Sequence, residues 1–581
     1  MMASNMTASP VALSRRRFLT LVTATAASTA LAACSSGSAT PAAPAAPATP
    51  TTGAPTMPPT VAAPTTAPTI TPPTVVPSTP APTAPAASVV TGAATTTSGA
   101  TMPNTLAPDA APRFRAVATR VMAAMAAAKV PGVSLGILAD GKEEYATFGV
   151  TSIETKTPVA PETLFQIGSL TKTYTGTALM RLVEQGKVDL DATVRTYLPD
   201  LKLADESVAA RVTITHLLTH MGGWWGDLFA DTGSGDDAIA RYVAMKLPTF
   251  PQIAPLGQYF SYNNAGFILA GRVIEVVTGK PYRAALADLV LSPLGMTQSF
   301  FAERDVLAHP YAVGHGDAKG GGFQVAKPLF LPRNVDPAGG ISSTAREQIR
   351  YARFHMGDGT ANGARVLKPE TLQRMQTAQP VELPGQATLR IGLPWVVQQL
   401  PGLRLLAHPG DTFGQHTEFV MVPDKGFAFV MLTNAVKGGA AASVALTEAL
   451  GQYLGVGPAA GTPGALVASP TPASLPPGIT LPPEKLAQYA GRYTLPSGTV
   501  TLRADNGTIA LSVEENTLPD QIKPNIQPED IPQGARLRFV KDDLALVGDT
   551  ATDAVPIPFV RKADGSIGWM SVGLRLIPKG G

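Results

Sequence analysis

The feature that most limits how this 581-residue chain can fold is a long stretch of low complexity near its start. Residues 34–107 consist mostly of Pro, Ala, Thr, Ser and Gly, with almost no charge. Such a composition cannot bury enough apolar surface to offset the loss of chain entropy, and closely spaced prolines favour an extended form. We therefore expect a disordered linker here, so that any globular core forms from the residues after 107.

The residues before this linker predict export. Residues 14–19 read Ser-Arg-Arg-Arg-Phe-Leu, a twin-arginine signal, and the apolar stretch that follows is too short to span a bilayer as a helix. The stretch ends in Leu-Ala-Ala-Cys34, which resembles the lipobox of bacterial lipoproteins. We expect residues 1–33 to be a signal, and Cys34 to carry the lipid that holds the protein to a bacterial membrane outside the cytoplasm. A cleaved secretory peptide with a chance cysteine is the alternative.

Cysteine count and charge exclude several classes of function. Cys34 is the only cysteine, so no intramolecular disulfide forms and no thiolate is left for catalysis or metal binding. The formal charge of +3 falls to zero once residues 1–33 are removed, because that segment holds three arginines and no acidic residue. No basic patch interleaved with aromatic residues is present, so nucleic acid is not an expected partner.

Helical and strand-like runs alternate in residues 108–456. In chain order they are a helix over 109–129, strands over 133–139 and 145–150 joined by Asp140-Gly141, a helical middle, strands over 419–423 and 427–433, and a helix near 440–454. This order predicts an α+β fold whose antiparallel sheet joins strands from opposite ends of the domain and is covered by helices.

A second linker, residues 457–483, precedes a small all-β module over 484–581. Short strands separated by turns are expected at 493–495, 499–503, 509–513, 537–540, 544–547 and 574–577. The module contains no constellation of catalytic groups in its sequence.

The first catalytic candidates are Ser169 and Lys172, at the start of a helix that is expected to run to Glu184. Side chains three residues apart lie on one helical face, about 5 to 6 Å apart, so the amine can reach the hydroxyl. That arrangement activates a weak nucleophile. Because Ser-x-x-Lys also arises by chance, its weight depends on what else the chain carries.

Two further motifs follow in order, Tyr262-Asn263-Asn264 and His408-Pro409-Gly410. With Ser-x-x-Lys they resemble the three motifs of serine β-lactamase-like hydrolases, which are also similar to penicillin-binding proteins. The likeness is to the branch of class C β-lactamases, esterases and D-aminopeptidases, and it covers roughly residues 110–455. The sequence is therefore identified as a member of this family, and the start of the C-terminal module, residues 489–493, resembles the lipocalin-like domain often appended to it.

The resemblance implies roles for the matching residues. Ser169 would attack an ester or amide carbonyl and form an acyl-enzyme. Lys172 and Tyr262 would share the proton transfers, with an ammonium at Lys172 favouring the Tyr262 phenolate. Asn264 would orient Lys172 and the substrate. No cofactor or metal is implied.

The third motif bears on the oxyanion and on the substrate. The backbone N–H groups of Ser169 and of about Asp411 would form the oxyanion hole, and Gly410 would let the backbone pass close to the substrate. Penicillin-hydrolysing members usually have Lys-Thr-Gly or Lys-Ser-Gly where this chain has His408-Pro409-Gly410, so a mostly neutral imidazole replaces an ammonium. His-x-Gly occurs in the esterase and D-peptidase branches of the family, so the resemblance implies small-molecule esters or D-amino-acid peptides as substrates.

Other functions remain open at this stage. Within the same family the alternatives are a β-lactamase or a D,D-carboxypeptidase. From another class, the chain would be a non-catalytic cell-envelope binding lipoprotein. The oligomeric state is not determined by these patterns.

Two local patterns have alternative interpretations. His216 and His220 are spaced like metal ligands on a helix, but no glutamate lies between them to act as a base, so no metal is expected. Trp224 and Trp225 either line a substrate cleft or pack in the core, and packing is favoured.

Overall fold

The computed structural model describes residues 104–318, 322–386, 388–400, 402–456, 475–518, 521, 535–548 and 554–580. The expected signal over 1–33, Cys34, and most of both linkers lie outside the described residues. In the part that is described, no helix is both long enough and apolar enough to cross a bilayer.

The main sheet is antiparallel and, counted over the described residues, has eight strands. Seven follow the order β10 (Leu389–Ile391), β11 (Val396–Leu400), β12 (Leu403–Ala407), β14 (Gln415–Val422), β15 (Phe427–Thr433), β1 (Gly132–Ala139) and β2 (Lys142–Gly149), while β13 (Gly410–Thr412) pairs with β14. β1 pairs with β15, so that Val133 lies opposite Thr433. The expected antiparallel sheet that joins the two ends of the domain is confirmed.

Local turn chemistry fixes the first hairpin. Asp140 and Gly141 connect β1 to β2 and both have positive φ, at 50° and 72°. A two-residue turn of this kind matches the twist of the strands it joins, and Asp-Gly is well suited to it. Each β1 residue therefore pairs in register with β2, from Gly132–Gly149 to Ala139–Lys142.

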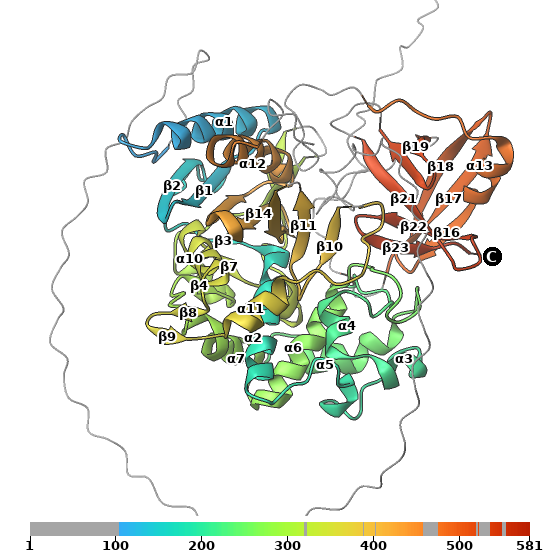
Figure 1. The fold of residues 1–581 in the computed structure, drawn as a ribbon, viewed down its shortest axis with the longest axis horizontal. Helices are drawn as coiled ribbons and strands as arrows, with labels where there is room; N and C mark the ends of the chain where they lie inside the picture. The colour runs from blue at the N-terminus through green and yellow to red at the C-terminus, as the bar shows by residue number, and fades with distance from the viewer. Residues whose placement is uncertain are drawn as a thin grey trace, which may run out of the picture. The chain divides into compact units, whose positions relative to one another are not determined.

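Helices bury both faces of the sheet. α1 (Pro112–Ala128) and α12 (Gly438–Leu454) lie side by side on one face (Figure 1). Leu135 of β1 and Phe429 of β15 pack into the core that these helices share. α10 (Ala345–Met356) contacts β1 and β15 on the other face. Both faces of β1 are buried, which accounts for its nearly continuous apolar sequence.

A helical region and several short strands complete the folded part that precedes residue 457, which is called the hydrolase part below after its sequence resemblance. The helices are α2 (Thr171–Glu184), α3 (Glu206–Arg211), α4 (Ile214–Leu218), α5 (Ala238–Met245), α6 (Asn264–Thr278), α7 (Tyr282–Leu286), α8 (Glu303–Leu307), α9 (Asp336–Gly339) and α11 (Pro369–Gln376). The short strands are β3 (Phe165–Gln166), β4 (Ser299–Phe300), β5 (His315–Asp317), β6 (Phe323–Val325), β7 (Ser342–Ser343), β8 (Thr360–Ala361) and β9 (Ala364–Arg365). α2 contacts both α6 and α9, which places the helix after Ser169 in the interior.

The C-terminal module is a nearly closed barrel, preceded by α13 (Pro483–Tyr489). Its eight strands within the described residues are β16 (Gly491–Leu495), β17 (Gly498–Asp505), β18 (Thr508–Glu515), β19 (Ala535–Lys541), β20 (Leu544–Val547), β21 (Val555–Arg561), β22 (Ile567–Val572) and β23 (Arg575–Pro578). Each strand pairs with the next, and Tyr493 bridges Lys579 to join the first strand to the last. The all-β prediction is confirmed, although β21 and β22 were not expected.

The ends of both linkers are more ordered than their composition indicates. Thr105 donates its N–H to Thr147 O at 3.0 Å, so the residues just before 108 add to the β2 edge. Ile479 donates to Phe539 O at 2.8 Å, and Leu481 is buried in the barrel core. A few apolar side chains within each stretch gain a partner from a folded unit, which composition alone does not reveal.

Candidate active site

Ser169 lies in a tight 3-10 turn, Gly168–Leu170, that leads directly into α2. Gly168 has φ 52°, and a Cβ built there would lie 2.6 Å from the backbone N of Asp411, so only glycine fits. Lys172 follows in the first turn of α2, and its Nζ lies 3.0 Å from Ser169 Oγ. The pair that the spacing indicated is therefore formed.

Lys172 is fully buried and is held by one backbone acceptor. Its Nζ donates to Ala338 O at 2.7 Å. Burial lowers the pKa of Lys172 well below its ordinary value, the charge of Arg575 lowers it further, and Asp227 opposes the shift. The amine is consequently able to accept a proton from the neighbouring hydroxyl.

Tyr262 approaches the same serine from the segment before α6. Its phenol lies close enough to Ser169 for that hydroxyl to lower its pKa, and Lys172 Nζ lies 5.0 Å from its ring centre. Burial raises the pKa of Tyr262 well above its ordinary value, although Ser169 and Arg575 act in the opposite direction. Burial therefore disfavours both charges of the expected pair of phenolate and ammonium, and it favours a phenol beside an uncharged amine.

His220 supports Tyr262 and was missed as a site residue. The two rings stack with centroids 4.2 Å apart, and Nδ1 of His220 accepts the N–H of Asn263 at 2.9 Å. α4 ends at Leu218, and His216 is engaged with Thr213 at the start of that helix. Among the described residues, no group of three or more His, Cys, Asp or Glu side chains is placed to hold a metal ion.

Asn264 takes a different partner from the one expected. Its Nδ2 donates to Asp227 Oδ1 at 2.7 Å rather than orienting Lys172. The preceding Asn263 caps α6, since its Oδ1 accepts the N–H of Gly266 at 2.7 Å. The Asn-Asn pair thus serves the helix start and the partly exposed carboxylate of Asp227.

His408 faces the same space from the opposite side. Its Nδ1–H donates to Pro409 O at 2.8 Å, while Nε2 is buried and has no hydrogen-bond partner among the described residues. Burial, and then the charge of Lys172, lowers the pKa of His408 to about 3. The imidazole is therefore neutral at physiological pH, as expected from its substitution for lysine.

Strand β13 lies directly against the nucleophile turn. A Cβ built on Gly410 would come within 1.9 Å of Ile167 O and 2.9 Å of Ser169 N. With the close approach of Asp411 N to Gly168, this brings the backbone of Ser169 and Asp411 together. The arrangement suits two backbone donors for one oxyanion.

The Asp411 carboxylate has a separate partner. Its Oδ1 accepts a hydrogen bond from His416 Nδ1 at 2.8 Å, and Glu418 lies 3.6 Å from the other ring nitrogen. Burial alone would lower the pKa of His416, but Asp411 and then Glu418 outweigh it and raise the pKa to about 10. Asp411 therefore offers its backbone to the site while its side chain pairs with an imidazolium.

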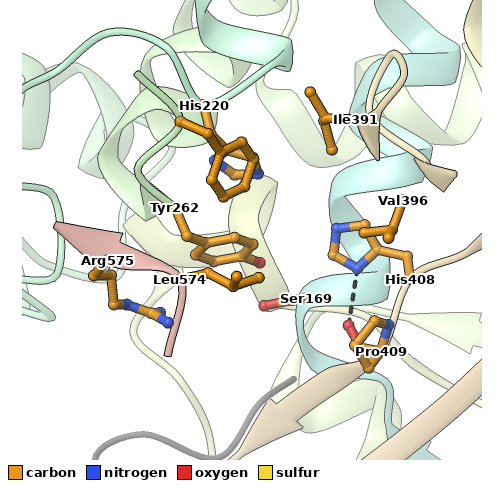
Figure 2. Close-up of a pocket in the computed structure, with 10 residues that line it drawn as sticks. Ser169, His220, Tyr262, Ile391, Val396, His408, Pro409, Leu574 and Arg575 are labelled. Atoms are coloured by element: carbon orange, nitrogen blue, oxygen red, sulfur yellow. Dashed lines mark hydrogen bonds between the residues drawn. The ribbon is translucent and has the colours of Figure 1, made fainter. Parts of the chain in front are cut away.

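These residues surround an open pocket. Its empty volume is about 400 Å³, including the part that is open to solvent. The lining residues are Ser169, His220, Phe260, Tyr262, Ile391, Val396, His408, Pro409, Leu574 and Arg575. Figure 2 shows Ser169 between Tyr262 and His220 on one side and His408 on the other. Trp224 and Trp225 are buried in the core and do not line this pocket, so they pack.

Leu574 and Arg575 belong to the barrel, so this module contributes to the pocket although its sequence contains no constellation of catalytic groups. Arg575 Nε donates to Asp227 Oδ2 at 2.7 Å, and its guanidinium carbon lies 4.8 Å from the centre of the Tyr262 ring. A single arginine beside a turn carries no local signal of this role. Only the packing of the chain's last hairpin against Tyr262 reveals it.

Comparisons with known proteins agree with this geometry. The family model described as Beta-lactamase matches residues 117–452. Penicillin-binding protein 4 of Amycolatopsis lactamdurans is 35% identical over 335 residues, which cover 56% of this chain and 87% of that protein. A beta-lactamase of Providencia stuartii is 32% identical, over 39% of this chain and 56% of that protein. An unguisins hydrolase of Aspergillus campestris is 27% identical, over 52% and 58%.

Solved structures share the fold. The structure of SurE with D-Leu aligns with a TM-score of 0.60 and 23% identity, covering 80% of this chain and 99% of SurE. The octameric penicillin-binding protein homologue of Pyrococcus abyssi aligns with a TM-score of 0.52 and 23% identity, covering 78% of this chain. With the family match over most of its hydrolase part, the chain belongs to the β-lactamase family.

Proposed function

We propose that this protein is a serine hydrolase that forms an acyl-enzyme at Ser169 and acts on esters or D-amino-acid peptides. The observation that carries the proposal is the buried pair of Ser169 and Lys172, with 3.0 Å between hydroxyl and amine. Burial lowers the pKa of this lysine and so favours its uncharged amine, which can accept the proton of the serine.

In the acylation step, Ser169 passes its proton to Lys172 and its oxygen attacks the substrate carbonyl. The negative charge on the carbonyl oxygen would be met by the backbone N–H groups of Ser169 and Asp411. The Tyr262 phenol then gives its proton to the leaving group and regains one from the Lys172 ammonium. Lys172 is thereby neutral again, and the acyl group remains on Ser169.

In the deacylation step, water replaces the leaving group. The water attacks the ester of Ser169 and its proton passes to the same Lys172–Tyr262 pair, which then returns a proton to the serine oxygen. One pair of groups therefore supports both halves of the reaction, since each group that gives up a proton in one half can take one in the other.

Two features of the pocket support the substrate class. His408 is neutral, so the pocket lacks an ammonium at the position where penicillin-hydrolysing members usually have one. Phe260, Ile391, Val396 and Leu574 form an apolar wall that suits an aliphatic or aromatic acyl group. Both features favour esters or D-amino-acid peptides.

The test is a substrate panel on the mature protein. p-Nitrophenyl esters of increasing acyl length and D-aminoacyl p-nitroanilides should be turned over, and Ser169→Ala should abolish turnover. No turnover of any member by the wild type would instead favour a binding lipoprotein without catalysis.

A second candidate, a penicillin-sensitive D,D-carboxypeptidase or a β-lactamase, is favoured by the 35% identical relative named penicillin-binding protein 4. A fluorescent penicillin tests the first and nitrocefin the second. Rapid labelling or turnover, with no hydrolysis of the ester panel, would replace the ester or peptide assignment.

We also propose export and lipid attachment, resting on residues 14–19 and Cys34. Cells given an alkyne-tagged fatty acid should incorporate it into the wild-type protein and not into Cys34→Ala. Equal incorporation into both would contradict the anchor.

A further inference from the structure

The tip of the last barrel hairpin reaches the active site. Gly573 and Leu574 connect β22 to β23 and have φ of 56° and 67°, the pair of positive values that a two-residue mirror-image turn requires. Tyr262 donates its N–H to Leu574 O at 2.9 Å, and Leu576 donates its N–H to Ser261 Oγ at 3.1 Å. The backbone of the tip is therefore fixed to the segment that carries Tyr262.

The Arg575 guanidinium is oriented by three contacts. Nε donates to Asp227 Oδ2 at 2.7 Å, Nη1 donates to Gly573 O at 2.7 Å, and the group stands over the Tyr262 ring. Nη2 has no hydrogen bond to any described residue, and 24% of the side chain is exposed. Two of the three guanidinium nitrogens are thus paired, and Nη2 remains available to a ligand at the pocket.

The charge of Arg575 is distinctive among the ten residues that line the pocket. Burial lowers the pKa of His220 and of His408, and it raises the pKa of Tyr262, so all three are neutral at neutral pH. The remaining lining residues, Arg575 apart, have no ionisable side chain. Arg575 is therefore the permanent cation in the lining, and guanidinium binds carboxylates more strongly than a neutral donor does.

The position of the cation indicates which part of a substrate it meets. Arg575 lies over Tyr262, the residue that would protonate the leaving group, whereas His408 lies across Ser169 on the other side (Figure 2). We propose that Arg575 binds a carboxylate carried by the leaving group of the substrate, which makes the barrel hairpin part of the specificity pocket. The inference rests on the proposed acyl-enzyme mechanism, and it narrows the substrates to those that release an acidic leaving fragment.

A purely structural role for Arg575 makes a different prediction. The ion pair with Asp227 also joins the barrel to the hydrolase part, so its loss could act by loosening that contact. The contact has other supports, because Trp569 Nε1 donates to Ile253 O at 2.6 Å and the hairpin backbone is bonded on both sides of Arg575. A variant that breaks the ion pair but keeps the cation separates the two roles.

The experiment compares two thioesters that differ in one group. N-acetyl-D-alanyl thioglycolate carries a carboxylate on its leaving group, and the thioglycolamide counterpart carries a neutral amide. Thiol release is followed with a chromogenic thiol reagent, and kcat/KM is measured for each substrate. For each variant, kcat/KM for the carboxylate substrate is divided by kcat/KM for the amide substrate. Dividing this ratio by the wild-type ratio cancels the difference in reactivity between the two leaving groups.

The variants are Arg575→Met, Arg575→Lys and Asp227→Asn. Arg575→Met should lower kcat/KM about 10- to 100-fold more for the carboxylate substrate than for the amide substrate, mainly through KM. Loss of the charge beside Lys172 and Tyr262 acts on both substrates alike, so it does not change the ratio of the two kcat/KM values. Arg575→Lys should fall between, since it keeps the charge but loses the planar fork. Asp227→Asn should keep the preference for the carboxylate.

Several results would overturn the inference. They are a wild-type enzyme without preference for the carboxylate, an equal loss for both substrates in the Met and Lys variants, or loss of the preference in Asp227→Asn. If Arg575→Met does not fold, the inference is tested with Arg575→Lys, from its ratio of kcat/KM for the carboxylate substrate to kcat/KM for the amide substrate. Thioester turnover that persists in Ser169→Ala would instead refute the proposed function, whichever way the ratio falls.

Discussion

At the scale of single residues, the site keeps its proton-carrying groups neutral by burying them. Lys172 and Tyr262 both lie in the interior, and an isolated charge there is unfavourable for either one. The same burial favours the uncharged amine, which can accept a proton, and the protonated phenol, which can donate one. Activation of Ser169 is therefore a consequence of packing around α2.

The first prediction concerns Lys172. Replacing it with Met should lower kcat/KM about 10²- to 10⁴-fold, the usual contribution of a general base. Replacing it with Arg should cost as much, because a guanidinium does not give up its proton. In the wild type, activity should fall as the pH drops through the lowered pKa of Lys172, which lies well below 10.5. A Lys172→Arg variant with normal activity would contradict this role.

The second prediction concerns His416, the imidazolium behind Asp411. Its pKa is about 10 in the folded protein and 6.5 ordinarily, so protonation stabilises the fold. This contribution is complete below pH 6.5 and is lost as the pH rises through 10. Urea unfolding of the wild type and of His416→Gln should show a gap in unfolding free energy that narrows across this range. A gap that is constant with pH would contradict the assigned charge.

How far the sequence predicted the site depends on whether a residue belongs to a local motif. Ser169, Lys172 and Tyr262 stood in recognisable patterns, and the structure brings them together. Arg575 and Asp227 stand in no pattern, because their role arises from a contact between segments 348 positions apart. Pairs of this kind are fixed by tertiary packing, which one sequence does not display.

At the scale of elements, strand β13 and the turn before α2 are pressed together without room for a side chain. The backbone of Gly410 meets Ile167 and Ser169, and that of Gly168 meets Asp411. The spacing of the two candidate oxyanion donors is therefore set by two glycines.

The third prediction follows for Gly410→Ala. The new methyl would lie 1.9 Å from Ile167 O, so strand or turn must move, at a cost of about 1 to 3 kcal/mol in unfolding free energy. Because the movement separates Ser169 from Asp411, kcat should fall more than stability alone explains. Gly451→Ala is the matched control, because Gly451 lies within α12 and a Cβ there would be 3.7 Å from its nearest neighbour. This variant should leave kcat unchanged and leave the unfolding free energy unchanged or slightly raised. Wild-type kcat in Gly410→Ala would refute the argument.

Elements with strong local signals were predictable, and elements completed by distant partners were not. The β1–β2 and β14–β15 hairpins of the central sheet and the helices α1 and α12 were expected, because turn residues and apolar periodicity mark them. No strand was expected over 389–407, where β10 to β12 lie. β10 is three residues long, and its apolar side chains pack against Phe260 and against Leu574 of the barrel. β21 was missed because Pro556 and Pro558 argue against a strand; they lie where β21 does not pair with β22.

At the scale of the whole molecule, the barrel completes the pocket instead of standing apart from it. Its last hairpin supplies Leu574 and Arg575, and Trp569 is buried against the hydrolase part with its ring 4.6 Å from that of Tyr259. The pocket wall therefore requires both parts to be folded and docked.

The fourth prediction concerns Trp569→Ala. Loss of the buried ring and of its bond to Ile253 should lower the unfolding free energy by about 3 to 5 kcal/mol. KM should rise, because the hairpin that forms one side of the pocket is less firmly held. Met245→Ala, at a side chain that is 60% exposed, should change stability by less than about 0.5 kcal/mol. Unchanged KM and stability in Trp569→Ala would show that docking does not shape the pocket.

The most direct test of the account is covalent labelling of the nucleophile. A serine-directed fluorophosphonate should increase the mass of the intact wild-type protein by that of one adduct. Peptide mapping should place the adduct on Ser169. The Ser169→Ala variant, shown to be folded by its unfolding transition, should remain unlabelled under the same conditions. Labelling that persists in Ser169→Ala, or that maps to another residue of the wild type, would contradict the assignment of Ser169 as the nucleophile.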